Sequence, residues 1–507
     1  YYAAMGTAFL FGSEIKALLT WPGLAREPDL AAIDRYLSLG YVLAPQTAFS
    51  GIYRLPAAHY LVLQARSDGR VDEPELTRYW RLPEPRALRH RSAAELQREL
   101  VAHLEEAVRL RLISDVPLGA FLSGGVDSSA VVATMARVGS GTVKTFSIGF
   151  SAKEYDETRY ARMVAQRYAT DHREFVVEPD AVAVLPRLVW HYGEPFADPS
   201  AIPTYYVSEL ARSHVTVALN GDGGDECFLG YKRYRAMRYL GWLDRMPRWS
   251  LAALARSLAL TPPSVQRRFR LPRVQALLQA CEEQPGRRYG FTLAAFADGD
   301  KEQGYGEEMR GGIDSAFDFL DPYFAEADTL VAGANWADLH TYLPDDLMVK
   351  VDVAGMAHGL ECRSPLLDHV LIEWAAGIPD QIKMARGVTK ALLKSAMKPY
   401  LPAALLYRPK MGFGCPIDHW FRSELKELAY DTLLSQRSHQ RGIFRSDYVR
   451  SLLAEHCART RDHHTRLWAL LMLELWFRMW IDSPAETAIL RPAAQPQAGA
   501  MMAETSL

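Results

Sequence analysis

The feature that most constrains this chain is a short apolar run, a glycine turn and a helical pattern that follow one another between residues 116 and 136. The run Leu118–Leu122 is short enough to form a buried parallel strand. The chain breaks at Ser123-Gly124-Gly125 and resumes over Val126–Arg137 with apolar residues at helical spacing. A strand, a glycine turn and a helix in that order predict an anion site, because the first backbone N–H groups of a helix have no partner within it.

The residues of this turn suit a phosphate that is accompanied by a divalent cation. Gly124 and Gly125 can adopt backbone conformations closed to other residues and let a phosphate approach the backbone. Asp127 adds a carboxylate that suits Mg²⁺. Three serines add hydroxyl donors: Ser123, Ser128 and Ser129. An ordinary βα turn with a Ser or Asp cap is the alternative interpretation.

The string SGGVDSS is more specific than a pair of glycines. It is not a Walker A loop, because no Lys follows the glycines. It resembles the PP-loop of the ATP pyrophosphatases, which cleave ATP between the α and β phosphates. That resemblance implies adenylation in place of phosphoryl transfer.

Length, charge and cysteine content set the class of protein that we expect. The 507 residues predict two or more domains, and a net charge of -2 gives no global field for nucleic acid or membrane. No uninterrupted apolar run reaches the roughly 18 residues of a transmembrane helix. The five cysteines are scattered and lack CxxC spacing, which is typical of reduced thiols. We expect a cytoplasmic protein that binds neither nucleic acid nor membrane.

Composition and periodicity divide the chain into four predicted segments. They are a piece of sheet at 1–64, a linker at 65–92, a large domain at 93–482 and a disordered tail at 483–507. The first segment contains apolar strands at Ala8–Phe11 and His59–Leu63. It is too small to bury both faces of a sheet, so we expect partner strands before it. Because the chain begins without Met at Tyr1, we expect a fragment.

Strands and helices alternate after a capping box formed by Ser92 and Glu95. The predicted strands are 118–122, 143–150, 173–177 and 215–219, and the helices between them are 126–137, 156–169, 181–192 and 199–213. This alternation predicts a doubly wound parallel α/β sheet. Ligands of such a sheet bind at the carboxyl ends of its strands.

The last predicted strand ends in a second acidic loop, NGDGGDE at Asn220–Glu226. A surface turn could have the same composition. In a parallel sheet, however, this loop opens on the same edge as SGGVDSS. Two acidic loops that face one triphosphate suggest joint binding of Mg²⁺, for which Asp127 and Asp225 are the predicted ligands.

Several motifs together resemble the glutamine-dependent asparagine synthetase family. They are SGGVDSS, FSIGF at Phe146–Phe150, NGDGGDECFLGY at Asn220–Tyr231, LECRSPLLD at Leu360–Asp368 and YRPKMGF at Tyr407–Phe413. The resemblance covers the family's synthetase domain and the tail of its amino-terminal glutaminase domain. It implies a PP-loop ATPase sheet embedded in helices, preceded by part of an N-terminal-nucleophile domain.

The resemblance implies ATP-dependent amide formation with ATP and Mg²⁺ as cofactors. A substrate carboxylate, aspartate first among them, attacks the α-phosphate, and ammonia from glutamine then displaces AMP. The implied nucleotide-binding residues are Leu122, Ser123, Gly124, Gly125, Asp127, Ser128, Ser129, Ile148, Asn220 and Gly221. The implied catalytic residues are Lys410, Asp222 and Lys390. A homodimer is left open.

The family's glutaminase nucleophile is a Cys at the mature amino terminus, and Tyr1 is not that residue. We therefore expect the given sequence to lack the start of the glutaminase domain and to use free ammonia. Two further positions depart from the family: Asn220 stands where Ser is usual, and Asp222 where Glu is common. The shorter Asp222 leaves the acceptor open between aspartate and another carboxylate, for example one in surface polysaccharide biosynthesis.

Three other interpretations share parts of this pattern. A β-lactam synthetase has both acidic loops but closes a ring internally. A PP-loop sulfurtransferase would use Cys227 or Cys415 as a carrier, and the lack of paired cysteines counts against it. A non-catalytic ATP-binding protein would bind ATP without releasing pyrophosphate.

Overall fold

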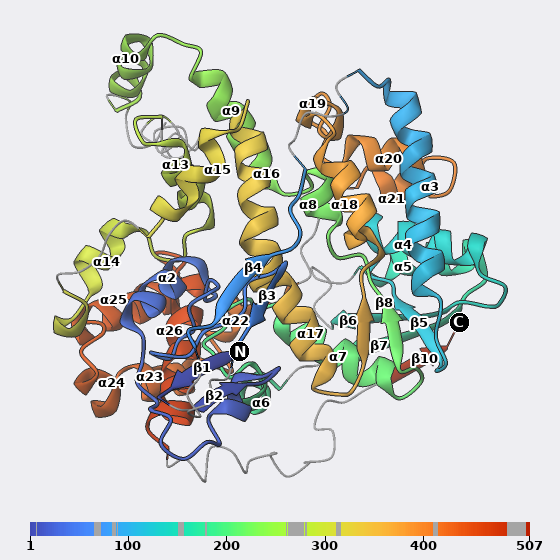
Figure 1. Ribbon diagram of the computed structural model, residues 1–507. Coiled ribbons are helices and arrows are strands. Elements are labelled where there is room, and N and C mark those ends of the chain that lie inside the picture. Colours follow the sequence, from blue (N-terminus) through green and yellow to red (C-terminus); the bar gives the residue numbers. More distant parts are fainter. Residues whose placement is uncertain are drawn as a thin grey trace.

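The strands after residue 116 form one six-stranded sheet, in the order β10-β7-β6-β5-β8-β9 (Figure 1). The computed structural model describes residues 1–6, 8–64, 72–83, 88, 90–150, 157–177, 180–259, 261, 278, 281–310, 316–408, 414–483 and 503–506. The strands of the sheet are β5 (Leu118–Phe121), β6 (Lys144–Phe150), β7 (Asp171–Val177), β8 (Val217–Leu219), β9 (Glu361–Arg363) and β10 (Ala503–Ser506). The four strands predicted from the sequence are all present, with small shifts at their ends.

The central strands are parallel, so the predicted α/β class is confirmed. β5 pairs in parallel with both β6 and β8, β6 pairs in parallel with β7, and β8 pairs in parallel with β9. Because β5 and β8 are neighbours and run in the same direction, the loops after Phe121 and Leu219 open at the same edge. The prediction that the two acidic loops share one edge is therefore confirmed.

Two strands of this sheet were not expected. β9 has three residues, too few to show an alternating pattern in the sequence. β10 lies in the segment that we expected to be disordered, and it pairs antiparallel with Arg173–Val176 of β7. Without β10, β7 would lie at the edge of the sheet. The unpaired backbone groups of an edge strand can bind a segment whose sequence shows no alternation of apolar and polar residues. The remaining residues of the predicted tail, 484–502 and 507, lie outside the described residues.

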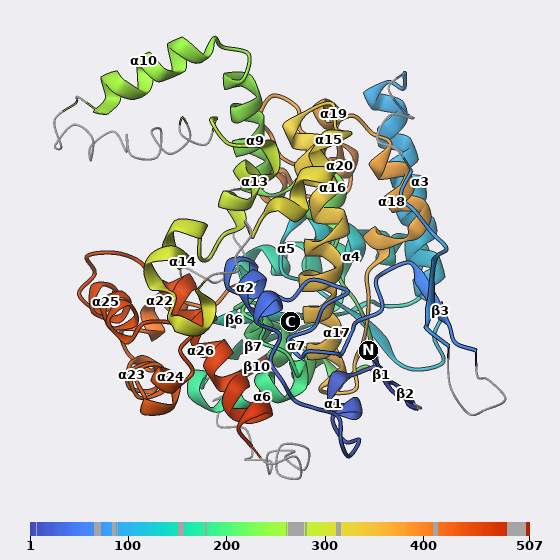
Figure 2. The same ribbon diagram turned by 60° about the vertical axis from the view of Figure 1, so that its left-hand side comes forward.

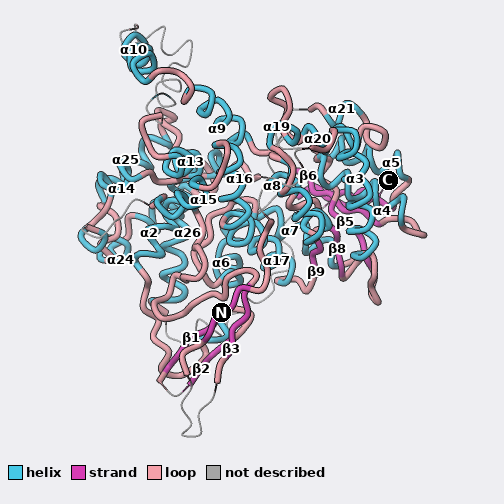
Figure 3. Tube along the Cα trace, turned by 45° about the horizontal axis from the view of Figure 1, so that its top comes forward, coloured by secondary structure: helices cyan, strands magenta, loops and turns pink. Residues whose placement is uncertain are grey.

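Helices cover both faces of the sheet (Figure 3). They are α3 (Ala93–Arg111), α4 (Val126–Val138), α5 (Thr158–Tyr168), α6 (Ala181–Tyr192), α7 (Ala201–Arg212) and the short α8 (Gly224–Phe228). Side chains of α3, α4 and α5 share one buried core with Ala120 and Leu122, whereas α6 and α7 share another with Phe146 and Phe175. The predicted capping box is confirmed: Ser92 N donates to Glu95 Oε2 at 2.9 Å.

The rest of the large segment is helical. Its helices are α9 (Lys232–Leu243), α10 (Arg248–Ala259), α13 (Pro285–Leu293), α14 (Asp298–Gly304), α15 (Asp321–Ala325), α16 (Leu330–His340), α17 (Met348–Met356), α18 (His369–Ala376), α19 (Asp380–Lys383), α20 (Ala391–Met397), α21 (Ala403–Leu406), α22 (Ile417–Trp420), α23 (Lys426–Leu433), α24 (Gln436–Gln440), α25 (Ser446–Cys457) and α26 (His464–Trp476). α10 projects away from the body (Figure 2). The Trp- and Leu-rich stretch at 465–482 belongs to the core, with Trp468, Trp476 and Trp480 fully buried. Among the described residues, no helix has the length and apolar character to cross a membrane.

The amino-terminal segment consists of two small hairpins and two helices. Its elements are β1 (Tyr2–Met5), β2 (Ala8–Phe11), α1 (Ile15–Leu18), α2 (Leu30–Leu39), β3 (His59–Val62) and β4 (Glu75–Arg78). β2 and β3 are confirmed as strands, but β4 falls within the predicted linker and pairs antiparallel with β3. The segment is joined to the helical part through buried contacts, since Lys301 Nζ donates to Asp34 Oδ1 at 2.8 Å.

Candidate active site

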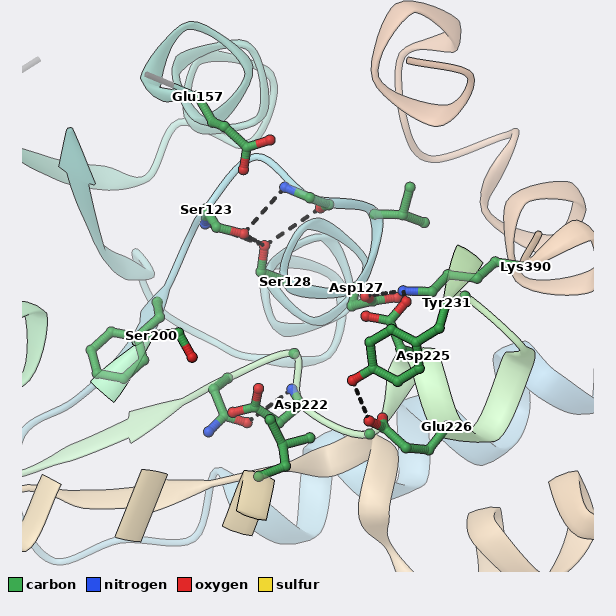
Figure 4. Close-up of a pocket in the computed structure, with 18 of the residues that line it drawn as sticks. Ser123, Asp127, Ser128, Glu157, Ser200, Asp222, Asp225, Glu226, Tyr231 and Lys390 are labelled. Atoms are coloured by element: carbon green, nitrogen blue, oxygen red, sulfur yellow. Dashed lines mark hydrogen bonds and ion pairs between the residues drawn. The ribbon is translucent and has the colours of Figure 1, made fainter. Parts of the chain in front are cut away.

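A cavity of about 750 Å³ lies where β5 and β8 end (Figure 4). Its volume falls in the range of pockets that hold small molecules and cofactors. The fold brings most of the predicted site residues to its wall, and these are Leu122, Ser123, Gly125, Asp127, Ser128, Ile148, Asn220, Gly221, Asp222, Asp225 and Lys390. Residues more than two hundred positions apart in the sequence therefore face one space.

Two predicted site residues that the structure describes, Ser129 and Gly124, are not on this wall. Ser129 is fully buried in α4, so its hydroxyl does not face the cavity. Gly124 lies in the turn, but its carbonyl oxygen accepts a hydrogen bond from Arg408 Nη2 at 3.0 Å. Lys410 lies outside the described residues, and its proposed role stays a prediction.

Two serine hydroxyls hold the glycine turn in shape. The backbone N–H of Ser123 donates to Ser128 Oγ at 3.2 Å, and that of Gly125 donates to Ser123 Oγ at 3.3 Å. The two hydroxyls are themselves 3.0 Å apart and hydrogen-bonded (Figure 4). Gly124 has a φ of +70°, and a Cβ there would lie 2.7 Å from the backbone nitrogen of Ala161. The turn is thus preorganised by its own side chains and requires glycine where it packs against α5.

The two acidic loops touch, and glycines allow that contact. A Cβ at Gly221 would lie 2.4 Å from Ser128 N, in the first turn of α4. A Cβ at Gly224 would lie 2.4 Å from Cγ of Asp127. Because real Cβ atoms do not approach backbone atoms so closely, the second loop requires glycine at position 221 to keep this contact with the first.

We expect Gly221→Ala to separate these loops and Gly141→Ala to be neutral. The added methyl group at position 221 meets backbone that cannot move aside, and overpacking of this kind costs about 1–3 kcal/mol. Gly141 has nothing within 4 Å of its added Cβ and serves as the matched control. Thermal melts with and without ATP would test this. If Gly221→Ala melts and binds ATP like the Gly141→Ala control, the loops are not held in contact as described.

The ammonium group of Lys390 lies between the carboxylates of the two loops. Lys390 Nζ donates to Asp127 Oδ2 and lies 2.7 Å from Asp225 Oδ1 (Figure 4). Burial opposes the charged form of Lys390, but the two carboxylates outweigh it and raise its pKa above its usual range. Lys390 also has a φ of 56° at the start of α20, a left-handed conformation that is uncommon for a non-glycine residue. The side chain is therefore held at this point between the loops.

The carboxylates of Asp127 and Asp225 can hold Mg²⁺ only together with oxygen ligands from another molecule. Among the described residues, no group of three or more His, Cys, Asp or Glu side chains could hold a metal ion. Asp127 and Asp225 supply two hard oxygen ligands that face a common point, which Lys390 Nζ occupies. Mg²⁺ is commonly held by one or two carboxylates together with substrate phosphates and water. The site thus suits a metal that arrives with a nucleotide and displaces the ammonium group.

The part of the cavity beyond β8 is acidic. Lys350 Nζ pairs with Asp198 Oδ2 at 2.9 Å, and both side chains line the cavity with Asp222. Burial raises the pKa of Asp222 to about 6; the charge of Lys350 opposes this shift, and those of Asp127 and Asp225 add to it. A carboxylate with this pKa is largely ionised at neutral pH and attracts a cationic group of a ligand.

Several residues at the cavity were not identified from the sequence. Arg408 pairs with Glu157, donates to the carbonyl of Gly124 and lines the cavity. Its position in the motif YRPKMGF could have identified it from the sequence. Asp198 and Lys350 come from distant elements without a motif of their own, so no local spacing could have paired them.

The chain matches two family models, one over each part. The model described as asparagine synthase matches residues 99–478, and the model described as glutamine amidotransferase domain matches residues 1–80. The second match ends just after β4, beyond the boundary at 64 that we expected.

Curated relatives match along most of the chain. Asparagine synthetase [glutamine-hydrolyzing] 1 of Bacillus subtilis is 31% identical over 489 residues, which cover 95% of this chain and 74% of the relative. A putative asparagine synthetase [glutamine-hydrolyzing] of Mycobacterium tuberculosis H37Rv is 34% identical over 502 residues, 96% of this chain and 74% of the relative. Amidase chyE of Penicillium rubens is 25% identical over 471 residues, 83% of this chain and 66% of the relative.

Proposed function

Because the chain belongs to the asparagine synthase family of ligases, we propose that it forms an amide from a carboxylate, ATP and ammonia derived from glutamine. The observation that carries the proposal is the contact of two glycine-rich acidic loops, with Asp127 and Asp225 facing one another across Lys390. Such an arrangement suits a triphosphate with its metal at the carboxyl edge of a parallel sheet. We further propose a doubly wound PP-loop fold and a cytoplasmic enzyme.

In the proposed first step, an oxygen of the acceptor carboxylate attacks the α-phosphorus of ATP. A new P–O bond forms, the bond to the β-phosphate breaks, and pyrophosphate leaves with its electron pair. The backbone of the Ser123–Ser128 turn and the cation of Lys390 would stabilise the charge that develops on the phosphates. Leu122 and Ile148 would face the adenosine part. Mg²⁺, when bound by Asp127 and Asp225 together with ATP, would neutralise phosphate charge.

In the proposed second step, ammonia attacks the acyl carbon and AMP leaves. The C–N bond forms as the C–O bond to AMP breaks, and the nitrogen loses a proton, which the carboxylate of Asp222 would accept. Asp222 lines the cavity and is the proposed catalytic carboxylate of the step. Lys410 stays a proposed contact to the phosphates.

A direct test of this proposal is product analysis with ¹⁵N-labelled ammonium. We expect aspartate, ATP and Mg²⁺ to yield labelled asparagine, AMP and pyrophosphate in equal amounts. Release of ADP and phosphate, or hydrolysis of ATP to AMP with no labelled amide from any carboxylic acid in a panel, would contradict it. Labelled amide from a different carboxylate would keep the chemistry and change the acceptor.

We propose that Asp222 helps to select the acceptor carboxylate. A substitution at this position should therefore change the preference among acceptors. Asp222→Glu moves the carboxylate further into the cavity, so we expect the kcat/KM ratio of aspartate to longer dicarboxylates to rise by about tenfold. Asp222→Asn keeps the size and removes the charge, so amide formation should fall by about 10²-fold. Equal acceptor preference in the wild type and Asp222→Glu would show that this residue does not determine which acceptor is used.

The pH dependence of amide formation provides a second readout for the same residue. Burial raises the pKa of Asp222 to about 6, so the carboxylate is protonated below that pH. We therefore expect kcat/KM to rise between about pH 5 and 7 in the wild type, and this limb to disappear in Asp222→Asn. The sign for stability is opposite: a raised acid pKa makes the free energy of unfolding fall as pH rises from about 4 to about 6.

A further inference from the structure

A second cavity, of about 390 Å³, is lined by Leu229, by residues of α16 and by the segment 376–383, which contains α19. Leu229 follows α8 directly and lines this cavity, whereas the next residue, Gly230, lines the active site. The two cavities thus share the turn that ends α8. None of the roles assigned above uses a residue of the second cavity.

A buried lysine, Lys383, lines this second cavity. Lys383 is 3% exposed, yet its Nζ has neither a hydrogen-bond nor an ion-pair partner among the described residues. The neighbouring carboxylate of Asp380 accepts a hydrogen bond from Thr329 Oγ1 at 2.6 Å, which directs it to the start of α16. Burial lowers the pKa of Lys383 to about 8, with Cys227 and Asp380 acting in the opposite direction. An ammonium group at the wall of a cavity, in a side chain buried to this extent, favours an anionic group that can pair with it.

The other side chains of this cavity restrict which anion suits it. Glu326 and Asp328 are exposed side chains at the cavity, and Asp380 is half-buried. Three carboxylates repel a phosphate or a dicarboxylate, so a purely anionic ligand does not suit the site. The remaining wall is largely apolar and includes Leu229, Leu339, Ala376, Ile378 and Ile382. The charges and the apolar wall together suit a ligand with one anionic group, one cationic group and an apolar part.

We propose that this cavity binds a free α-amino acid with an apolar side chain, its carboxylate paired with Lys383 and its ammonium group held by the acidic side chains. The carboxylate gives the buried ammonium the charge-assisted hydrogen bond that the protein does not supply. The side chain of the ligand contacts the aliphatic wall beside Trp336. The volume of the cavity exceeds that of one such ligand and leaves room for water.

Titration calorimetry with L-leucine on the intact chain would test this site. We expect saturable binding to the wild type, and binding at least about tenfold weaker in Lys383→Met, because a hydrogen bond to a charged group is lost. Lys398→Met, at an exposed lysine in the same part of the fold, is the matched control and should bind as the wild type does. Isovalerate and isoamylamine, which carry one charge each, should both bind more weakly than L-leucine.

Two further variants keep the test decisive. Ala332→Phe fills the cavity without changing Lys383 and should also abolish binding. Asp127→Asn alters the proposed active site and should leave L-leucine binding unchanged, which separates this inference from the proposed function. No saturable binding of L-leucine or of any other apolar amino acid to the wild type would overturn the proposal. Equal binding in Lys383→Met and the wild type would overturn it as well.

Discussion

Replacing either Asp127 or Asp225 by Asn is expected to reduce ATP-dependent pyrophosphate release by about 10²-fold or more at saturating substrate. Both carboxylates lie at Lys390 Nζ, one from each acidic loop, and they are the proposed ligands of the metal that accompanies ATP. Asn keeps the size of the side chain and removes the negative charge. The variants should therefore have a lower turnover number and need a higher Mg²⁺ concentration for half-maximal activity.

The matched control for these variants is Asp115→Asn, because Asp115 is exposed and precedes β5 at the opposite end of that strand. We expect it to retain full activity. Melting temperatures measured on the same samples distinguish a chemical from a structural loss, since Lys390 keeps one carboxylate partner in each single variant. If both active-site variants retain normal Mg²⁺-dependent pyrophosphate release, the assignment of the metal ligands is wrong.

Lys390→Met is expected to have the largest effect on stability, and Mg²⁺ should reverse part of it. Removal of the buried ammonium group takes away the cation between two half-buried, facing carboxylates, and breaking a buried ion pair in this way costs about 3–5 kcal/mol. Mg²⁺ provides the missing positive charge, so it should raise the melting temperature of this variant more than that of the wild type. The turnover number should also fall by about a hundredfold, because a cation next to the phosphates is lost.

Lys398→Met is again the control, since this exposed lysine lies one residue after α20, which Lys390 begins. Urea unfolding at several Mg²⁺ concentrations measures the effect. A Lys390→Met variant whose unfolding midpoint matches that of the control, with and without Mg²⁺, would mean that Lys390 does not neutralise the two carboxylates.

The sequence predicted the outline of the site because that outline follows from chain order. Alternating strands and helices form a parallel sheet, and a parallel sheet brings the loops after β5 and β8 to one edge. The contact of Gly221 with the start of α4 depends on exact loop conformations, which no local pattern encodes. Lys390 reaches Asp127 from 263 positions away, and the sequence offers no periodicity over that distance.

Four short strands were not predicted, whereas β2, β3, β5 and β8, which are equally short, coincide with apolar runs in the sequence. β1, β4, β9 and β10 have three or four residues each, and such segments gain their structure from the partner strand more than from their own composition. Lys383 was not noticed either, because a lysine in an ordinary helical stretch is usually exposed. Its burial follows from packing around α16 and α19, which becomes visible only in three dimensions.

Exchange of labelled pyrophosphate into ATP is the measurement that tests the central claim most directly. The assay isolates the first half-reaction, so it needs neither ammonia nor glutamine. We predict exchange that requires Mg²⁺ and a carboxylic acid, is supported by aspartate or another member of a panel of carboxylic acids, and is lost in Asp127→Asn. ATP that binds without exchange in the presence of every carboxylic acid tested would contradict adenylation and favour a non-catalytic nucleotide-binding protein.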